Sequence, residues 1–161
     1  MTDTRPRFIT PGGYAQIRVE YEELFGVERP KIVEIVSWAA SLGDRSENAD
    51  YLYGKKRLRE IDRRLSHLAR IMKAAKIVDP AAQADQDQVR FGATVELADE
   101  DDRPRTVTIV GDDETDASSN RIGWSAPIAR ALIGARVGEA RTVRLPAGEM
   151  TYEVMGIRYP E

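Results

Sequence analysis

The sequence predicts an α+β protein in which a long antiparallel α-helical coiled-coil hairpin precedes a small antiparallel β-sheet with one helix. Apolar residues recur at alternating spacings of three and four over residues 14–24 and again over 51–75, which is the pattern of a coiled-coil seam. A polar stretch with a proline follows, and beyond it the apolar pattern changes to a period of two, as in β-strands. The predicted division is a helical domain over 1–79, a linker over 80–87 and a sheet domain over 88–161.

The first helix is expected to begin at Thr10–Pro11, with Thr10 as its N-cap. Pro30 predicts a kink or a break near Glu28–Arg29, because proline lacks the N–H that a helix interior needs. The pattern then resumes to Ala40, and Gly43 suits a left-handed helix end. The apolar positions of this helix are Tyr14, Ile17, Tyr21, Leu24, Ile32, Ile35, Val36 and Ala39.

A second helix is expected to follow at once, with Asp44 or Ser46 as its cap, and to run to about Ile77. Two such helices joined by a short turn form an antiparallel hairpin. The seam positions of the second helix are Tyr51, Gly54, Leu58, Ile61, Leu65, Leu68, Met72 and Ala75.

The second half of the chain contains alternating apolar and polar runs separated by turn residues. Strands are predicted over 88–97, 105–110, about 120–124, 139–145 and 151–159, with a short helix over 127–133. The acids at 99–102 are interpreted as residues of a solvated turn. Gly156 is expected to mark a β-bulge in the last strand.

Composition narrows the chemistry available to this chain. Its 161 residues are 32% charged and 42% hydrophobic, as expected of a globular protein. The absence of cysteine excludes a disulfide framework and a thiol nucleophile, and one histidine makes a multi-histidine metal site improbable. No membrane-spanning run or secretory leader is recognised, so a cytoplasmic protein without membrane contact is expected. The net charge of −3 divides into +3 for residues 1–80 and −6 for 81–161, which favours two units with different partners.

Three acids lie at intervals of three where the second helix begins: Asp44, Glu47 and Asp50. One interpretation is structural, because carboxylates near a helix N-terminus cap free N–H groups and interact favourably with the helix dipole. The other is chemical, because neighbouring carboxylates suit Mg²⁺, which often takes only one or two of them together with water and phosphate. Such a pair would complete a metal site in a partner rather than form one alone.

Basic residues follow the acids along the second helix. Between Lys55 and Arg70 there are seven Lys or Arg against two acids. The heptad pattern places Lys56, Arg59, Arg63 and Arg70 on the face opposite the seam, whereas Lys55, Arg57 and Arg64 flank it. The structural interpretation is a solvated face with intrahelical pairs to Glu60 and Asp62. The functional one is a surface for a nucleic-acid backbone.

The segment WAASLGDRSENADY at 38–51, continued by KKRLREIDRR at 55–64, resembles the bacterial Gre transcript-cleavage factors, and within them the more basic GreB branch. ITPGGY near the start, ERP at the expected kink, KIVD after the second helix and API-ARALIG in the second half extend the resemblance to the whole chain. The resemblance implies a transcription elongation factor that is not itself an enzyme. It implies a coiled coil that enters the secondary channel of bacterial RNA polymerase and a C-terminal domain with an FKBP-like fold that grips the channel rim.

The resemblance also assigns roles to individual residues. It implies that Asp44 and Glu47 stabilise a second Mg²⁺, held jointly with the polymerase and only weakly by the free protein, for hydrolysis of backtracked RNA. Ser46, Asn48, Asp50 and Tyr51 would support this tip. The extruded RNA 3′ end would contact the basic patch Lys55, Lys56, Arg59 and Arg63, and the polymerase rim would contact Trp124, Ser125 and Pro127. A monomer is expected.

One departure and two alternatives accompany this assignment. Many family members have Ser-Pro preceded by an acid before the short helix, where this chain has Ser125-Ala126-Pro127 and no such acid. A homologue that occupies the channel and inhibits without cleavage would have altered tip acids, but both are present here. An FKBP-like prolyl isomerase would need an aromatic-lined pocket within 88–161, where the available aromatics are Phe91, Trp124, Tyr152 and Tyr159.

Overall fold

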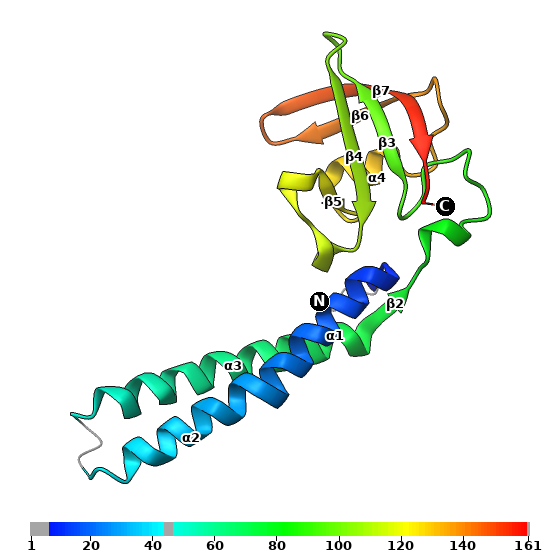
Figure 1. Ribbon diagram of the computed structural model, residues 1–161. Helices are drawn as coiled ribbons and strands as arrows, with labels where there is room; N and C mark the ends of the chain where they lie inside the picture. Colours follow the sequence, from blue (N-terminus) through cyan, green and yellow to red (C-terminus); the bar gives the residue numbers. More distant parts are fainter. Residues whose placement is uncertain (1–6, 44–46, 161) are drawn as a thin grey trace. The chain divides into compact units, whose positions relative to one another are not determined.

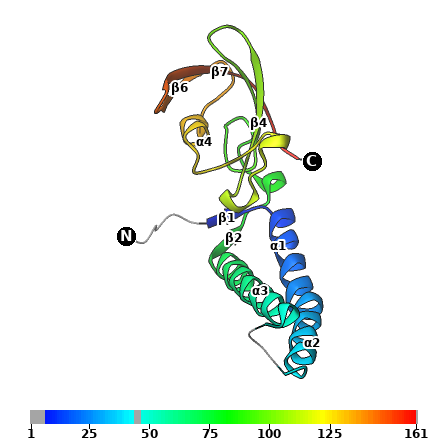
Figure 2. The same cartoon turned by 90° about the vertical axis from the view of Figure 1, so that its left-hand side faces the viewer.

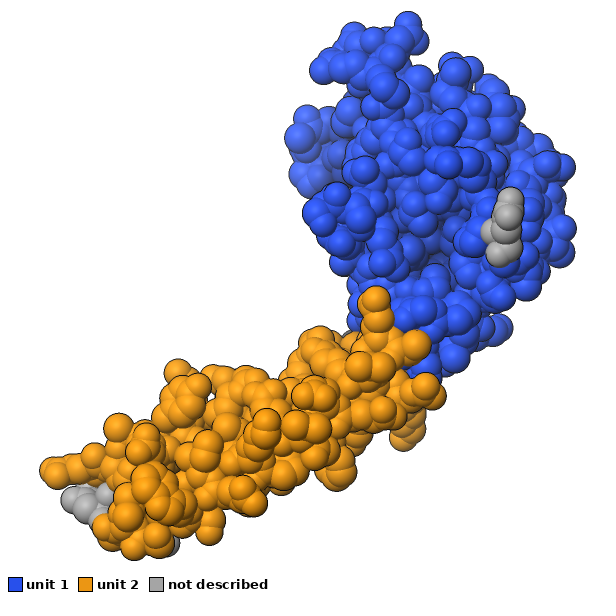
Figure 3. Space-filling model, viewed as in Figure 1, with its two compact units in different colours: residues 1–14, 75–161 blue, residues 15–74 orange. Residues whose placement is uncertain are grey.

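The computed structural model describes residues 7–43 and 47–160, and it divides the chain into two compact units. Residues 15–74 form a helical unit, and residues 1–14 with 75–161 form a unit built around a β-sheet (Figure 3). The α+β class predicted from the sequence is therefore confirmed. The division differs from the predicted domain boundaries, because residues 7–14 and 75–79 group with the sheet rather than with the helices.

The first helical arm is continuous, although it contains Pro30. It consists of α1 (Pro11–Glu23), a π-helical turn η1 (Leu24–Glu28) and α2 (Arg29–Ala40). Pro30 has no N–H to bond the carbonyl four residues earlier, and its ring would crowd that carbonyl. The wider turn relieves both problems, with the N–H of Arg29 donating to the carbonyl of Leu24. The predicted irregularity near Glu28–Arg29 is thus a π turn and not a break.

The second arm is α3 (Ala49–Ala74), which runs antiparallel to α2 in the helical unit (Figure 1). The predicted helix was expected to reach Ile77, but the chain leaves the helix at Ala74. Residues Ala75–Ile77 instead form strand β2, which pairs in parallel with β1 (Arg7–Ile9). The backbone groups of this segment are therefore satisfied by a partner from the other end of the chain, which no local pattern could reveal.

The two arms pack along most of the predicted seam. The buried seam residues are Ile17, Leu24, Ala39, Gly54, Ile61, Leu65 and Leu68. Two positions differ from the prediction: Ile71 is buried whereas Met72 is only half-buried, and Ile35 is 44% exposed. Ile35 follows the π turn, whose extra residue changes which side chains of α2 face the partner helix.

Gly54 allows α2 and α3 to approach closely. A Cβ atom at this position would lie 2.6 Å from Cγ2 of Val36 on the opposite arm. This glycine is therefore a packing requirement of the seam, although by helix propensity alone it weakens α3.

The sheet unit contains five strands in the order β5-β4-β3-β7-β6. Their bounds are β3 Thr94–Ala98, β4 Pro104–Val110, β5 Arg121–Gly123, β6 Ala140–Leu145 and β7 Gly148–Arg158. The sheet is not wholly antiparallel as predicted, because β5 pairs in parallel with β4. The connection from β4 to β5 runs through two short 3-10 turns, η3 (Asp112–Glu114) and η4 (Ala117–Ser119), which turn the chain back to the same direction.

Helix α4 (Pro127–Leu132) packs inside the curl of this sheet and completes its core (Figures 1 and 2). The predicted first strand began at Gln88, but β3 begins at Thr94. Gln88 forms only an isolated antiparallel bridge with Arg136, and residues 90–93 form a turn. In this turn Gly92 adopts a φ of +90° and lies against Pro80 of the 3-10 turn η2 (Pro80–Ala82). The most buried core side chains are Val89, Val95, Leu97, Val107, Ile109, Leu132, Val143 and Val154.

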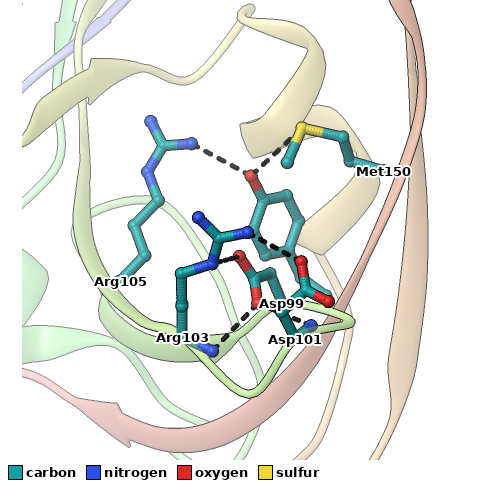
Figure 4. A network of polar contacts seen from close by, with 6 residues as sticks. Asp99, Asp101, Arg103, Arg105 and Met150 are labelled. Atoms are coloured by element: carbon teal, nitrogen blue, oxygen red, sulfur yellow. Dashed lines mark hydrogen bonds and ion pairs between the residues drawn. The ribbon is translucent and has the colours of Figure 1, made fainter.

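Two local predictions in the sheet are confirmed. The register between β3 and β7 shifts opposite Gly156, which is the expected bulge. The acids after β3 belong to a turn, in which Oδ1 of Asp99 accepts from the N–H groups of Asp101 and Arg103 at 2.9 Å (Figure 4). Arg103 also forms an ion pair with Asp101 at 2.7 Å, so these acids stabilise the hairpin.

Candidate nucleic-acid interface

The connection between the two helical arms holds the predicted acidic tip. Asp44 and Ser46 lie outside the described residues, so the structure places neither of them. Glu47 is exposed just before α3, and Asp50 is exposed in its first turn. Glu47 therefore presents a solvated carboxylate next to the start of a helix.

Asn48 connects the two arms beside Glu47. Its Oδ1 accepts from the N–H of Tyr51 at 3.2 Å, so Asn48 is the N-cap of α3 in place of the predicted Asp44 or Ser46. Its Nδ2 donates to the carbonyl of Ala39 at 2.6 Å, which satisfies an acceptor in the last turn of α2. The cap lies later than predicted because the connection between the arms is longer, with α3 beginning only at Ala49. The preference of asparagine for N-caps was the available signal.

Tyr51 and Lys55 form a cation–π pair on the first two turns of α3. The Lys55 ammonium lies 5.8 Å from the centroid of the Tyr51 ring. Tyr51 is half-buried at a seam position, so this contact holds Lys55 toward the seam side of the helix. Lys55 thus differs from the other cations of the predicted basic patch.

Six of the cations of α3 fall into two sets that differ in their partners. Arg57 forms ion pairs with Glu28 on the opposite arm and with Glu60, and Arg64 pairs with Glu20 at 2.9 Å. We call Arg57 and Arg64 the seam-flanking set. The hydrogen bond that Arg57 donates to Glu28 raises the pKa of Arg57, although burial opposes the shift. These two arginines were correctly predicted to flank the seam, and they are engaged across it.

The second set is exposed and unpaired. Within 7–43 and 47–160, its members have neither a hydrogen-bond nor an ion-pair partner. The structural interpretation required intrahelical pairs from this face to Glu60 and Asp62, and neither forms. Glu60 pairs with Arg57 instead. Asp62 binds Arg29 of the other arm at 2.8 Å, and this hydrogen bond raises the pKa of that arginine. We call the set the outward set; it consists of Lys56, Arg59, Arg63 and Arg70.

The predicted rim-contact residues lie in the sheet unit. Trp124 is half-buried, and its ring lies 4.5 Å from that of Phe8 and edge-on to Phe91 at 6.4 Å. The N–H of Ser125 donates to Asp112, and Pro127 is exposed at the start of α4. Phe8 was missed by sequence reasoning because it comes from the other end of the chain.

Trp124 also borders an open cavity of about 300 Å³, which Phe8, Phe91 and Ile133 line together with the cationic Lys76 and Arg90. The other two aromatics considered for an isomerase pocket are engaged elsewhere. The hydroxyl of Tyr152 accepts from Arg105 (Figure 4), and that of Tyr159 donates to the carbonyl of Gln88.

Two searches of residues 7–43 and 47–160 gave negative findings. No group of three His, Asp or Glu side chains is arranged to hold a metal ion. No helix of this part of the chain is long and apolar enough to cross a membrane.

Comparisons with known proteins give consistent matches over both halves of the chain. Residues 7–77 match the family model "Transcription elongation factor, N-terminal", and residues 83–159 match "Transcription elongation factor, GreA/GreB, C-term". Transcription elongation factor GreB of Neisseria meningitidis is 49% identical over 158 residues, which cover 98% of this chain and 96% of that protein. GreB of Pseudomonas aeruginosa is 48% identical over 94% of this chain and 90% of its own length. Among solved structures, GreA factor homolog 1 (Gfh1) of Thermus thermophilus is 22% identical, with 96% of this chain and 99% of that chain covered and a TM-score of 0.44.

Proposed function

Because this chain belongs to the GreA/GreB family of transcription elongation factors, we propose that it stimulates cleavage of backtracked RNA by bacterial RNA polymerase. In this proposal the two helical arms act as a coiled coil that enters the secondary channel of the polymerase. The sheet unit, as an FKBP-like domain, contacts the channel rim through Trp124, Ser125 and Pro127. The protein acts as a monomeric accessory factor, and the polymerase supplies the rest of the hydrolytic site.

One observation carries the proposal: an exposed carboxylate at the end of the arms is followed on the same helix by the four unpaired cations of the outward set. Glu47 is solvated, and the outward set begins nine residues later at Lys56. α3 has 26 residues, so at 1.5 Å per residue it is roughly 39 Å long. An acid at the start of such a helix and cations along it suit an RNA strand whose end must reach a metal site.

The residues at the tip suit magnesium as a shared ligand. Carboxylate oxygens are preferred by Mg²⁺, which commonly uses one or two of them and completes its octahedron with water and phosphate oxygens. Glu47 and Asp44 are the carboxylates we assign to this role. Bound there, the ion would stabilise the attacking and leaving oxygens of the phosphodiester and lower the pKa of a bound water.

We assign a supporting role to the neighbouring residues of this chain. Asn48 joins α3 to α2 directly after Glu47, which limits how far the tip can spread. We assign Ser46, Asp50 and Tyr51 to the same supporting role. The outward set would hold the phosphates of the extruded RNA, and Lys55 would add a cation close to the tip.

The test is RNA cleavage in a stalled, backtracked elongation complex with Mg²⁺. Asp44→Asn and Glu47→Gln are expected to abolish stimulation while polymerase binding, measured by competition with the wild-type protein, stays unchanged. Glu34→Gln makes the same chemical change at an exposed acid of α2 and serves as the matched control. The rate of RNA cleavage with this control variant should equal the rate with the wild-type protein.

Two outcomes would contradict the proposal in different ways. If Glu47→Gln loses binding and cleavage together, the acid has a capping or folding role instead. If the wild-type protein slows nucleotide addition but leaves the RNA intact, it is a non-cleaving inhibitor of the secondary channel.

A further inference from the structure

Tyr53 is an exposed aromatic residue near the tip. It lies in the second turn of α3, and 68% of its surface is open to solvent. Within the described part of the chain Tyr53 forms no side-chain hydrogen bond, no aromatic ring pair and no cation–π contact. Tyr51, two residues earlier, differs in both respects, because it is half-buried at the seam and carries the Lys55 ammonium over its ring.

Tyr53 shares its helix face with the outward set. Positions three, ten and seventeen residues after it are Lys56, Arg63 and Arg70, and these spacings keep all four on one side of an α-helix. Leu52 is also exposed, at 50%, and lies on the other side of this row, at the helix position that Arg59 occupies one heptad later. The tyrosine therefore lies at the tip end of the row of unpaired cations.

The spacing of this row suits a single nucleic-acid strand. Successive cations at Lys56, Arg63 and Arg70 are about 10.5 Å apart along the helix axis. Phosphates in a stacked strand advance roughly 3.4 Å each, so one cation falls at about every third phosphate. Tyr53 lies roughly 4.5 Å beyond Lys56, which is about one nucleotide further along the strand.

Charge and ring together favour RNA as the occupant of this face. Proteins that bind single strands without sequence preference combine a cationic track for the phosphates with aromatic side chains on which bases stack. A protein partner would need acids at each of these cations, whereas a phosphate backbone supplies negative charge at every step. The exposed carboxylate of Glu60, seven residues after Tyr53 and therefore on its side of the helix, is paired with Arg57 at 3.3 Å.

We propose that Tyr53 is a stacking platform for one base of the extruded RNA, and that the phosphates following this base contact Lys56 and Arg63. The assignment rests on the proposed cleavage function and identifies a residue that orients the RNA next to Glu47. Stacking is tolerant of base identity, so the platform accepts any of the four bases.

The experiment uses the full chain with backtracked complexes whose extruded RNA contains either normal or abasic nucleotides. Tyr53→Ala is expected to slow cleavage of normal RNA on the order of 10-fold, because one stacked base is lost. Tyr53→Phe keeps the ring and should remain within about 2-fold of the wild type on the same grounds. Leu52→Ala removes an exposed neighbour and should have no effect. Alanine favours helix, so none of these losses would reflect a failure to fold.

The abasic RNA isolates the stacking contact. With it, the wild type should fall to the rate of Tyr53→Ala, and that variant should change no further. Equal rates of wild type and Tyr53→Ala on normal RNA would overturn the inference while leaving the cleavage function intact. A loss in Tyr53→Ala that persists on abasic RNA would overturn it too, because the ring would then be contacting protein.

Photocrosslinking from a thiolated base in the extruded RNA gives a readout that does not depend on cleavage. The wild type should crosslink within α3, and Tyr53→Ala should reduce the yield whereas Leu52→Ala should not. If this dependence is observed without any cleavage, the stacking inference holds and the proposed cleavage function fails. If the yield does not depend on Tyr53, the inference fails.

Discussion

Arg57 and Arg64 differ from Arg59 and Arg63 in their surroundings, although all four lie within eight residues of one helix. The seam-flanking pair forms ion pairs with Glu28 and Glu20 of the first arm, so its positive charge is compensated within the protein. The outward pair has no partner among the residues described and faces solvent. The heptad position alone separates the two groups.

This difference indicates how one helix combines two tasks. A guanidinium engaged with a carboxylate in two contacts, as Arg64 is with Glu20, is compensated and offers little to a phosphate. An unpaired cation keeps its full charge and releases counterions when it meets a polyanion. Substitutions on the two faces should therefore change different measurable properties.

The largest effect is expected from reversing the outward charges. Replacing Lys56, Arg59 and Arg63 together by Glu should lower cleavage of RNA with a long extruded segment on the order of 100-fold, because three phosphate contacts become repulsive. The melting temperature should stay unchanged. The assay compares complexes backtracked by about two and by about ten nucleotides, and the long segment should lose more, since it alone spans several cations.

The salt dependence of a variant neutralised at the same three positions gives an independent check. For single strands the logarithm of affinity falls with the logarithm of salt at about 0.7 per phosphate contact, so neutralising three cations to Gln should reduce the slope by roughly 2. An equal loss on short and long extruded segments, or an unchanged slope, would mean that the outward set does not contact the RNA.

A smaller effect, on stability alone, is expected at the inner face. Gly54→Val places atoms where Val36 already lies, at 2.6 Å from a Cβ, and overpacking of this kind costs about 1–3 kcal/mol in free energy of unfolding. Ser66→Val adds the same side chain to the exposed face and should change stability by less than about 0.5 kcal/mol. Denaturant unfolding of both variants measures the difference, and equal stabilities would show that the arms can separate at Gly54 without cost.

The seam and the position of each cation followed from the sequence because they depend on a local period. Apolar spacing places Ile61, Leu65 and Leu68 at the seam whatever the partner is. Features that depend on contacts with distant residues could not be predicted from the sequence. The end of α3 at Ala74 is set by pairing with β1, and the exposure of Ile35 is set by a π turn that Pro30 induces. The parallel pairing of β5 with β4 likewise depends on how η3 and η4 turn the chain.

The candidate site was predictable to a similar degree. The exposure of Glu47 and of the outward set was predicted from spacing and charge, and the structure describes both as exposed, whereas their roles stay predictions. The cap at Asn48 was not predicted, because the choice among Asp44, Ser46 and Asn48 depends on the length of the connection to α2. Phe8 beside Trp124 was missed for the same reason as β1, since chain ends carry no local sign of what they pack against.

The bond pattern of Asn48 leads to a prediction with two separable parts. Asn48→Ala removes both the cap and the link to Ala39, and loss of an N-cap typically costs about 1 kcal/mol. Asn48→Asp keeps an oxygen for the N–H of Tyr51 but places an acceptor against the carbonyl of Ala39. If the cap alone matters, Asn48→Asp should be as stable as the wild type. If the link matters, both variants should unfold at lower denaturant concentration, and only Asn48→Ala should lose helix at the start of α3 in hydrogen exchange.

The smallest effect is expected from the seam-flanking arginines. Arg64→Ala removes an exposed ion pair between the arms and should lower the melting temperature by only roughly 1–4 °C, and Arg57→Ala should act similarly. Arg59→Ala, on the outward face, should leave the melting temperature unchanged.

A charge exchange separates the ion pair from side-chain packing, because a long side chain also covers apolar surface. The double variant Glu20→Arg with Arg64→Glu exchanges the two partners of the pair. That exchange should restore the melting temperature at low salt and lose its advantage at high salt, since exposed pairs are screened. A melting temperature equally low in Arg59→Ala and Arg64→Ala would mean that helix position does not separate the two sets. It would contradict the inference that only the seam-flanking set stabilises the arms.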